Sequence, residues 1–293
     1  MIAISDREFG VIRNIVYKNT GINLTEEKRS LVIGRLYRYL KESRYDSFTS
    51  YCNHLLEDRT GKALNDLVNR ITTNFTYFYR ESRHFDFFTS NILPEMITRL
   101  KNEQSNDLRI WCAGCATGEE PYTLAILMLE FFGNRYSAWD AGVLATDISE
   151  KALRKAISAI YSSDSLRKVP SMIKRKYFRK VDDRTWQLTE EVKKEVLFRR
   201  FNLINNRFPF KKPFHTIFCR NVMIYFDHPT RLEIIKKFHD FLVPGGYLIV
   251  SHSESLGRSQ DLYRYVMPGV YQKPWRRLST ANSVQTGITF GTD

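Results

Sequence analysis

A glycine turn followed by two carboxylates is the first feature of this chain that could do chemistry. The segment from Ile110 to Ile126, IWCAGCATGEEPYTLAI, has an apolar run ending in Gly114, a turn containing Gly118, and a helix-like pattern. Glycines at such a turn let the backbone approach a ligand, and the helix N-terminus offers free N–H groups. Glu119 and Glu120 would repel a phosphate there but would suit the amino group of a cationic or zwitterionic ligand. The turn could also be purely structural.

Two further elements strengthen the case for a ligand site. Asp147 ends the apolar run AGVLATD, where an acid can accept both ribose hydroxyls of a nucleoside. Asp147 and Ser149 also precede KALRKA, so a helix N-cap is a compatible second reading. FLVPGGYLIV (Phe241 to Val250) places Pro-Gly-Gly between a helix and a strand. Each element alone is weak, but the three together are typical of S-adenosylmethionine-dependent methyltransferases.

Other reactive residue types form no convincing constellation. Cys112 and Cys115 make a CxxC pair, but no second pair or nearby histidine completes a metal site, so no metal is expected. His252 could be a base, although a structural role is the simpler interpretation. No His–Asp or Cys–His arrangement for nucleophilic catalysis stands out.

Two regions of different periodicity must position these groups. Residues 1–70 repeat apolar side chains every three or four positions, which predicts a small all-α domain with a helix over Lys28–Arg44. From about Leu108, strand-like runs alternate with helical ones, which predicts an α/β, Rossmann-like domain with a mostly parallel sheet. The expected strands are RIWCAG, AGVLATDIS, HTIFCR and GYLIVSHSE, with a helix from Pro229 to Leu242.

A basic stretch at residues 162–200 interrupts this alternation. Within it, WQLTEEV and KEVLFRRFNL could be short antiparallel strands, so we expect a small antiparallel β-subdomain inserted into the methyltransferase domain at 86–278. Residues 71–85 are expected to form a linker that carries active-site residues. Residues 279–293, rich in small polar side chains, are expected to be a flexible tail.

Composition limits the class of protein. The 293 residues are 43% hydrophobic and 26% charged, which excludes a disordered or collagen-like chain. The net charge of +13 favours an anionic partner, which could be nucleic acid, a membrane surface or an acidic protein. Four cysteines are too few for a disulfide scaffold, and neither a signal peptide nor an 18-residue apolar run is evident. We expect a soluble cytoplasmic protein.

Five ordered motifs across residues 5–275 resemble the CheR chemoreceptor methyltransferases. They are ITTNFTYFYRE (Ile71 to Glu81), GCATGEEPY, ATDIS, FCRNVMIYFD (Phe218 to Asp227) and SHSESL. The resemblance implies that S-adenosylmethionine donates a methyl group to glutamate side chains on chemoreceptor cytoplasmic helices. The products would be glutamate methyl esters and S-adenosylhomocysteine.

The resemblance also implies roles for individual residues. The expected cofactor-binding residues are Asn74, Thr76, Arg80, Gly114, Glu120, Asp147, Asn202, Leu203, Arg220 and Asn221. Glu120 is expected near the amino acid portion of the cofactor and Asp147 at the ribose. Asn202 and Leu203 are expected to flank the adenine.

Arg80 and Tyr225 are the expected catalytic residues, with Arg220 and Asn221 beside Tyr225 at the methyl-transfer end. A glutamate carboxylate is already ionised at neutral pH, so attack on a sulfonium methyl group needs no strong base. The site must instead align oxygen, carbon and sulfur and exclude water. Without the resemblance, Arg80 could be a surface residue paired with Glu81 or Asp86, and Tyr225 could be core packing.

The charge pattern suggests how an acidic partner would dock. Lys28, Arg35, Arg38 and Lys41 share one side of the expected second helix, opposite an apolar side. This stripe could be a solvated face, or it could dock beside glutamate-rich receptor helices, as the resemblance implies.

The inserted subdomain argues against tethering to a receptor tail. Members of the family that bind a receptor C-terminal pentapeptide have a glycine-containing loop there, whereas YFRKVDDRTWQLTEEV is compact and lacks glycine. We therefore expect a pentapeptide-independent protein. We also expect a monomer that is recruited to membrane receptor arrays without membrane insertion.

A nucleic acid methyltransferase and a non-catalytic cofactor-binding signalling module remain alternatives, although no nucleic-acid recognition module is evident.

Overall fold

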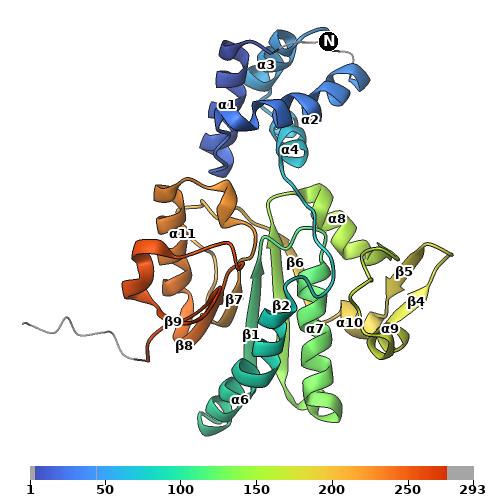
Figure 1. The fold of residues 1–293 in the computed structure, drawn as a ribbon, viewed down its shortest axis with the longest axis vertical. Helices are drawn as coiled ribbons and strands as arrows, with labels where there is room; N and C mark the ends of the chain where they lie inside the picture. The colour runs from blue at the N-terminus through green and yellow to red at the C-terminus, as the bar shows by residue number, and fades with distance from the viewer. Residues whose placement is uncertain (1–3, 44, 276–293) are drawn as a thin grey trace, which may run out of the picture.

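A bundle of short helices forms the N-terminal part of the protein (Figure 1). The computed structural model describes residues 4–43 and 45–275. The helices are α1 (Asp6–Thr20), α2 (Arg29–Glu42), α3 (Phe48–Glu57) and α4 (Lys62–Ile71), with a 3-10 turn (Glu26–Lys28) before α2. Their buried apolar residues, among them Phe9, Val32 and Leu67, form one separate core. The prediction of an all-α N-terminal domain is confirmed.

An extended linker connects this bundle to the rest of the chain (Figure 1). It leaves α4 after Ile71 and ends at α5 (Ser82–Phe87), which continues through a π-helical turn (Phe88–Ile92) into α6 (Leu93–Asn102). Phe78 of the linker is fully buried against Tyr161 and Phe178, so an aromatic contact anchors the linker to the inserted subdomain.

A seven-stranded sheet forms the centre of the larger domain, in the order β6-β2-β1-β7-β8-β10-β9. The strands are β1 (Asp107–Ala113), β2 (Asp140–Asp147), β6 (Val196–Arg200), β7 (Phe214–Phe218), β8 (Leu242–Ile249), β9 (Arg264–Met267) and β10 (Val270–Gln272). The first five in spatial order pair in parallel, whereas β10 pairs antiparallel with both of its neighbours, β8 and β9. This confirms the predicted mostly parallel sheet.

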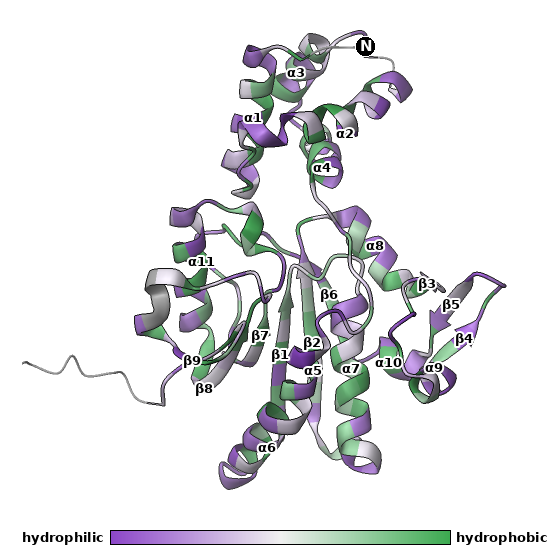
Figure 2. Cartoon of the chain, in the orientation of Figure 1, coloured by the Kyte–Doolittle hydropathy of each residue, from purple (hydrophilic) through white to green (hydrophobic). Residues whose placement is uncertain are grey.

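Helices cover both faces of the sheet. Successive residues of β1 alternate between two cores: Ile110 and Cys112 face one, and Trp111 and Ala113 face the other. The first core contains α7 (Glu119–Phe132), and the second contains α11 (His228–Asp240). Figure 2 shows α7 as largely hydrophobic, as expected for a helix buried on most of its surface.

The inserted subdomain is smaller than the sequence analysis predicted. Its antiparallel sheet has the order β3-β5-β4, from β3 (Ile160–Ser162), β4 (Phe178–Lys180) and β5 (Thr185–Leu188), with the short helices α9 (Ser171–Tyr177) and α10 (Glu190–Lys193). The prediction that KEVLFRRFNL adds an antiparallel strand here is wrong. Its residues Val196–Arg200 form β6, which pairs in parallel with β2 at the edge of the main sheet.

The Pro-Gly-Gly segment is part of a strand instead of the predicted turn. Pro244, Gly245 and Gly246 lie within β8, where the pairing with β7 shifts register. A Cβ atom on Gly246 would lie 3.0 Å from the carbonyl oxygen of His215. The glycine therefore allows close backbone approach between the two strands.

Two further expectations concern the whole chain. Among residues 4–43 and 45–275, none of the helices combines the length and apolar character required to cross a bilayer. The predicted flexible tail at 279–293 lies outside the described residues.

Candidate functional site

A pocket lies at the carboxyl ends of β1, β2 and β7, where the helical bundle and the linker meet the sheet. It contains about 1160 Å³ of space without protein atoms, including open solvent at its mouth. All the predicted cofactor and catalytic residues line it: Asn74, Thr76, Arg80, Gly114, Glu120, Asp147, Asn202, Leu203, Arg220, Asn221 and Tyr225. These residues come from five separate segments, so the fold brings together what the sequence separates.

The turn after β1 depends on its glycines. Gly114 has φ of 85° and Gly118 has φ of 95°, conformations that other residues rarely adopt. A Cβ atom on Gly114 would collide with Val222, and one on Gly118 would lie 2.8 Å from the Cβ atom of Ala156. The turn therefore requires glycine at both positions, and its residues Gly114, Cys115 and Ala116 line the pocket.

Asp147 connects the turn after β1 to the end of β2. Its two carboxylate oxygens accept hydrogen bonds from the backbone N–H groups of Ala116 and Ser149, each at 2.8 Å. Burial raises the pKa of Asp147, and these N–H groups oppose that rise. The cap of α8 (Glu150–Ser158) is Ser149, whose hydroxyl accepts the N–H of Ala152 at 3.2 Å. The Asp147 carboxylate is thus held rigidly at the pocket wall, in a position to accept ribose hydroxyls.

Arg220 carries a buried positive charge at the end of β7. Its side chain is 1% exposed, and its two terminal nitrogens lie 2.6 Å from Glu120 Oε2 and 3.4 Å from Glu81 Oε2. The guanidinium also donates to the carbonyl oxygen of Arg80. These contacts tie the linker, the start of α7 and β7 together at one point.

Arg80 and Tyr225 approach the pocket from different elements. The Arg80 guanidinium donates to the carbonyl oxygen of Phe75 at 3.0 Å, within the linker. Tyr225 ends a 3-10 turn (Met223–Tyr225), and its carbonyl oxygen accepts the N–H of Asn23 at 2.8 Å. The Tyr225 ring also packs against the core of the helical bundle, so the core-packing reading holds for part of this side chain.

The end of the pocket predicted to bind adenine is partly formed by the helical bundle. Asn202 Nδ2 donates to the carbonyl oxygen of Asn19 at 2.7 Å, and Leu203 is buried beside it. Thr20 and Ile22 also line the pocket, and the sequence analysis did not identify them. Gly21 between them has φ of 72°, but the sequence alone gives no reason to place this turn near the site.

Two carboxylates near the pocket were also missed as site residues. Glu254 is buried and accepts the backbone N–H groups of Asn221 at 2.9 Å and Ser251 at 2.8 Å, and burial raises its pKa. Glu81 pairs with Arg220. Both residues stand within the motifs ITTNFTYFYRE and SHSESL, so an acidic residue in a mostly uncharged motif was the available signal.

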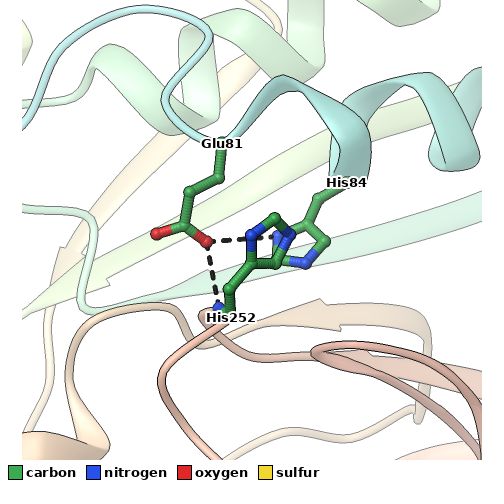
Figure 3. A group of neighbouring side chains, drawn as sticks. All are labelled: Glu81, His84 and His252. Atoms are coloured by element: carbon green, nitrogen blue, oxygen red, sulfur yellow. Dashed lines mark hydrogen bonds and ion pairs between the residues drawn. The ribbon is translucent and has the colours of Figure 1, made fainter.

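Glu81, His84 and His252 form a cluster close to Arg220, and Figure 3 shows these three side chains. One ligand atom from each lies within 4.8 Å of the others, a donor set that could coordinate a metal ion. However, the Glu81 oxygen near His84 is also 3.4 Å from the Arg220 guanidinium and accepts the His252 N–H at 3.2 Å. A divalent ion there would face a buried positive charge, so we assign this carboxylate to Arg220. The expectation of no metal stays a prediction.

The four predicted docking residues lie outside the pocket and do not behave alike. Arg35 of α2 donates to the carbonyl oxygen of Ile71 and to Thr73 Oγ1 at 2.6 Å, and burial lowers its pKa. Lys28 donates to the carbonyl oxygen of Asn23 at 3.0 Å. Arg38 and Lys41 are exposed. Arg35 therefore holds the start of the linker and Lys28 holds the segment between α1 and α2, whereas Arg38 and Lys41 are available for a partner.

The pocket fits S-adenosylmethionine in its chemistry. The glycine turn exposes backbone to a ligand, Asp147 suits a ribose diol, and the Glu120 carboxylate suits an amino group. Phe201 and Leu203 provide an apolar wall for a base. These features agree with the cofactor expected from the sequence.

Comparison with known proteins decides the family. The CheR methyltransferase all-alpha domain matches residues 7–72, and the CheR methyltransferase SAM binding domain matches residues 74–270. The chain belongs to the CheR methyltransferase family. It is 41% identical to the chemotaxis protein methyltransferase of Borreliella burgdorferi, over 93% of this chain and 96% of that protein. It is 34% identical to the chemotaxis protein methyltransferase of Escherichia coli, over 87% and 86%.

The comparisons support several expectations from the sequence. The resemblance to CheR and the two-domain fold class are confirmed. This CheR protein is an S-adenosylmethionine-dependent methyltransferase of chemotaxis. The roles of individual site residues are not tested by the comparisons and remain predictions.

Replacing Asp147 with Asn should weaken cofactor binding. The NH2 group of Asn replaces one of the two oxygens that each accept a backbone N–H, so one of these hydrogen bonds is lost and a ribose meets fewer acceptor sites. Loss of a charge-assisted hydrogen bond predicts an affinity for S-adenosylmethionine that is roughly tenfold to a hundredfold lower, measured by calorimetry. Asp140→Asn, at the exposed opposite end of β2, is the matched control and should bind normally. Equal affinities for both variants would contradict the assigned role.

Proposed function

We propose that this CheR methyltransferase transfers the methyl group of S-adenosylmethionine to glutamate side chains on chemoreceptor cytoplasmic helices. The observation that carries the proposal is the composition of the pocket wall. Among the described lining residues there is no histidine or lysine, and the one cysteine, Cys115, has a pKa well above its usual value because it is buried. The two acids in the lining, Glu120 and Asp147, are engaged by Arg220 and by backbone N–H groups. A pocket without a free general base suits an acceptor that is already ionised, as a glutamate carboxylate is at neutral pH.

The residues of the pocket would act by positioning. Bound S-adenosylmethionine supplies an electrophilic methyl group on its sulfonium sulfur. Arg80 would hold one oxygen of the acceptor carboxylate, and the Tyr225 hydroxyl would orient the other or the methyl group. A tight ion pair with Arg80 would reduce the nucleophilicity of the acceptor carboxylate. Because the Arg80 guanidinium also donates a hydrogen bond to the Phe75 carbonyl oxygen, its pairing with the acceptor would be weaker. The linker and the bundle would exclude water.

The proposal includes a docking surface on α2. The exposed cations Arg38 and Lys41 lie one turn apart and can attract a glutamate-rich helix, while Arg35 is occupied by the linker. Arg38 has an exposed Glu42 partner at 3.5 Å, a weak pairing that a receptor carboxylate can replace. Of the four residues in the docking stripe predicted from sequence, the proposal therefore keeps the two exposed ones, Arg38 and Lys41.

The proposal also includes independence from a receptor-tail pentapeptide. The hairpin between β4 and β5 is closed by a short turn in which Asp182 accepts the N–H groups of Arg184 at 2.7 Å and Thr185 at 2.8 Å. These hydrogen bonds stabilise a compact turn, which supports the expectation that the loop does not bind a receptor tail. We further propose a cytoplasmic monomer that reaches receptor arrays through these protein contacts.

Label transfer tests the proposed reaction and its catalytic residues. Tritium from labelled S-adenosylmethionine should appear in receptor cytoplasmic fragments and be released by mild base as volatile methanol, which identifies a carboxyl methyl ester. Arg80→Ala and Tyr225→Phe should lower the rate of transfer by roughly a hundredfold and tenfold while changing cofactor affinity much less.

The outcomes separate the alternatives. Transfer to RNA instead of receptor fragments would favour a nucleic acid methyltransferase. Cofactor binding without transfer to either acceptor would favour a non-catalytic signalling module. Near-normal transfer by both variants would refute the two catalytic assignments but leave the reaction intact.

Charge reversal on α2 should weaken receptor recognition. The double variant Arg38→Glu, Lys41→Glu is expected to raise the KM for receptor fragments by roughly tenfold at low salt, with a smaller difference at high salt because ions screen exposed charges. Arg7→Glu, Arg13→Glu on the exposed side of α1 is the matched control. An unchanged KM would mean that the acceptor docks elsewhere.

Removing the receptor tail should have little effect. Full-length receptors and receptors that lack the C-terminal pentapeptide are expected to be methylated with KM values within about twofold, because no tether contributes effective concentration. Calorimetric binding of a free pentapeptide at micromolar affinity would show that the inserted subdomain does bind a tail.

A further inference from the structure

A short turn after β7 carries two of the predicted site residues, Asn221 and Tyr225. Its 3-10 segment (Met223–Tyr225) begins after Val222, whose side chain makes no capping hydrogen bond. The first N–H groups of a helix have no partner within the helix itself. A side chain from another segment that accepts them would therefore fix the conformation of this turn.

The carboxylate of Glu254 is such an acceptor. Its Oε2 atom accepts the N–H of Asn221 at 2.9 Å, and its Oε1 atom accepts the N–H of Ile224 at 3.2 Å. Asn221 has φ of 58°, a left-handed backbone conformation that is uncommon for residues other than glycine. One side chain thus holds both the start and the middle of the turn that ends at Tyr225.

The loop after β8 holds the Glu254 carboxylate in place. The N–H of Ser251 donates to Glu254 Oε2 at 2.8 Å, and the N–H of Glu254 donates in return to the carbonyl oxygen of Ser251 at 3.0 Å. This reciprocal pair closes the loop on its own acidic side chain. The carboxylate therefore reaches the turn from a rigid base.

Backbone N–H groups stabilise this buried acid. Glu254 is 7% exposed, and burial raises its pKa, an effect that the hydrogen bonds from the main chain oppose. Arg220, which precedes Asn221 in the chain, is already paired with Glu81 and Glu120. Removing the Glu254 carboxylate would therefore release the turn and leave the ion pairs of Arg220 in place.

The helical bundle holds the other end of the turn. The carbonyl oxygen of Tyr225 accepts the N–H of Asn23 at 2.8 Å, and Phe226 forms an isolated β-bridge with Ile22. The bundle thus fixes the end of the turn and Glu254 fixes its start. The position of the Tyr225 hydroxyl depends on both.

We propose that Glu254 is a positioning residue for methyl transfer, which holds the Tyr225 hydroxyl at the methyl-transfer end of the pocket through the backbone of residues 221–224. Glu254 is not among the described residues that line the pocket, so it acts without touching cofactor or acceptor. The inference rests on the role proposed above for Tyr225.

A double-mutant cycle on the full-length protein tests the proposal. Tritium transfer to receptor fragments is measured at saturating S-adenosylmethionine for Glu254→Gln, Tyr225→Phe and the double variant. Glu254→Gln keeps the shape of the side chain but replaces one accepting oxygen with an NH2 group, and should lower kcat roughly fivefold. A residue that acts through Tyr225 should cost no more than the loss of its hydroxyl, so adding Glu254→Gln to Tyr225→Phe should lower kcat by less than about twofold.

Three comparisons separate positioning from general damage. In Arg80→Ala, whose side chain is held from the linker, Glu254→Gln should still lower kcat roughly fivefold. Glu57→Gln, an exposed glutamate on α3, should transfer at the native rate. If Glu254→Gln does not fold, Glu254→Asp keeps the charge but withdraws the carboxylate by one methylene group. It should lower kcat roughly threefold, and again only while the Tyr225 hydroxyl is present.

Hydrogen exchange gives a readout that needs no acceptor. Backbone amides of residues 221–225 should exchange about tenfold faster in Glu254→Gln than in the native protein, because the turn loses its support from the carboxylate. The amides of α7 should exchange at the native rate.

Specific outcomes would overturn the proposal. An equal loss of kcat with and without the Tyr225 hydroxyl would mean that Glu254 only supports the fold. Unchanged exchange over residues 221–225 would mean that the turn keeps its place without the carboxylate. Near-normal transfer by Tyr225→Phe alone would overturn both this inference and the role of Tyr225. A native protein that methylates no receptor fragment would instead contradict the proposed acceptor, and hydrogen exchange would still decide whether Glu254 holds the turn.

Discussion

The buried guanidinium of Arg220 is the group on which the arrangement of the site depends. A charge with a side chain only 1% exposed must be paired, because desolvation without compensation costs several kcal/mol. Its partners come from the linker at Glu81 and from the start of α7 at Glu120. The ion pairs of Arg220 therefore hold the linker, the start of α7 and the end of β7 together at the carboxyl end of the sheet. If the linker moved away from the sheet, Arg220 would lose Glu81 and the carbonyl oxygen of Arg80 and would keep only Glu120.

The helical bundle is part of the site as well as a separate domain. Thr20 and Ile22 line the pocket. Arg35 of α2 donates to the last carbonyl oxygens of α4 and to the hydroxyl of Thr73 in the linker. A partner bound to the exposed side of α2 would thus lie on the same helix that fixes the linker. Thr73 stands two residues before Phe75, whose carbonyl oxygen accepts the hydrogen bond from Arg80.

Charge is distributed differently on the surface and in the pocket. The chain has a net charge of +13, but the pocket and its surroundings contain Glu81, Glu120, Asp147 and Glu254. A basic surface attracts acidic partners over the length set by ionic screening, whereas buried carboxylates act only on a ligand that enters the pocket. The net positive charge of the chain therefore coexists with a group of carboxylates at the pocket.

The sequence by itself determined the parts of the site that depend on local pattern. The glycines at 114 and 118, the acid at Asp147 and the linker motif were recognisable because turn geometry and strand or helix periodicity depend on near neighbours. Tertiary structure alone decided that Val196–Arg200 joins the main sheet, that Arg35 holds the linker and that Glu81 pairs with Arg220. Each of these joins residues far apart in the chain, and the choice among equally suitable partners is made by packing and burial, which no local pattern encodes.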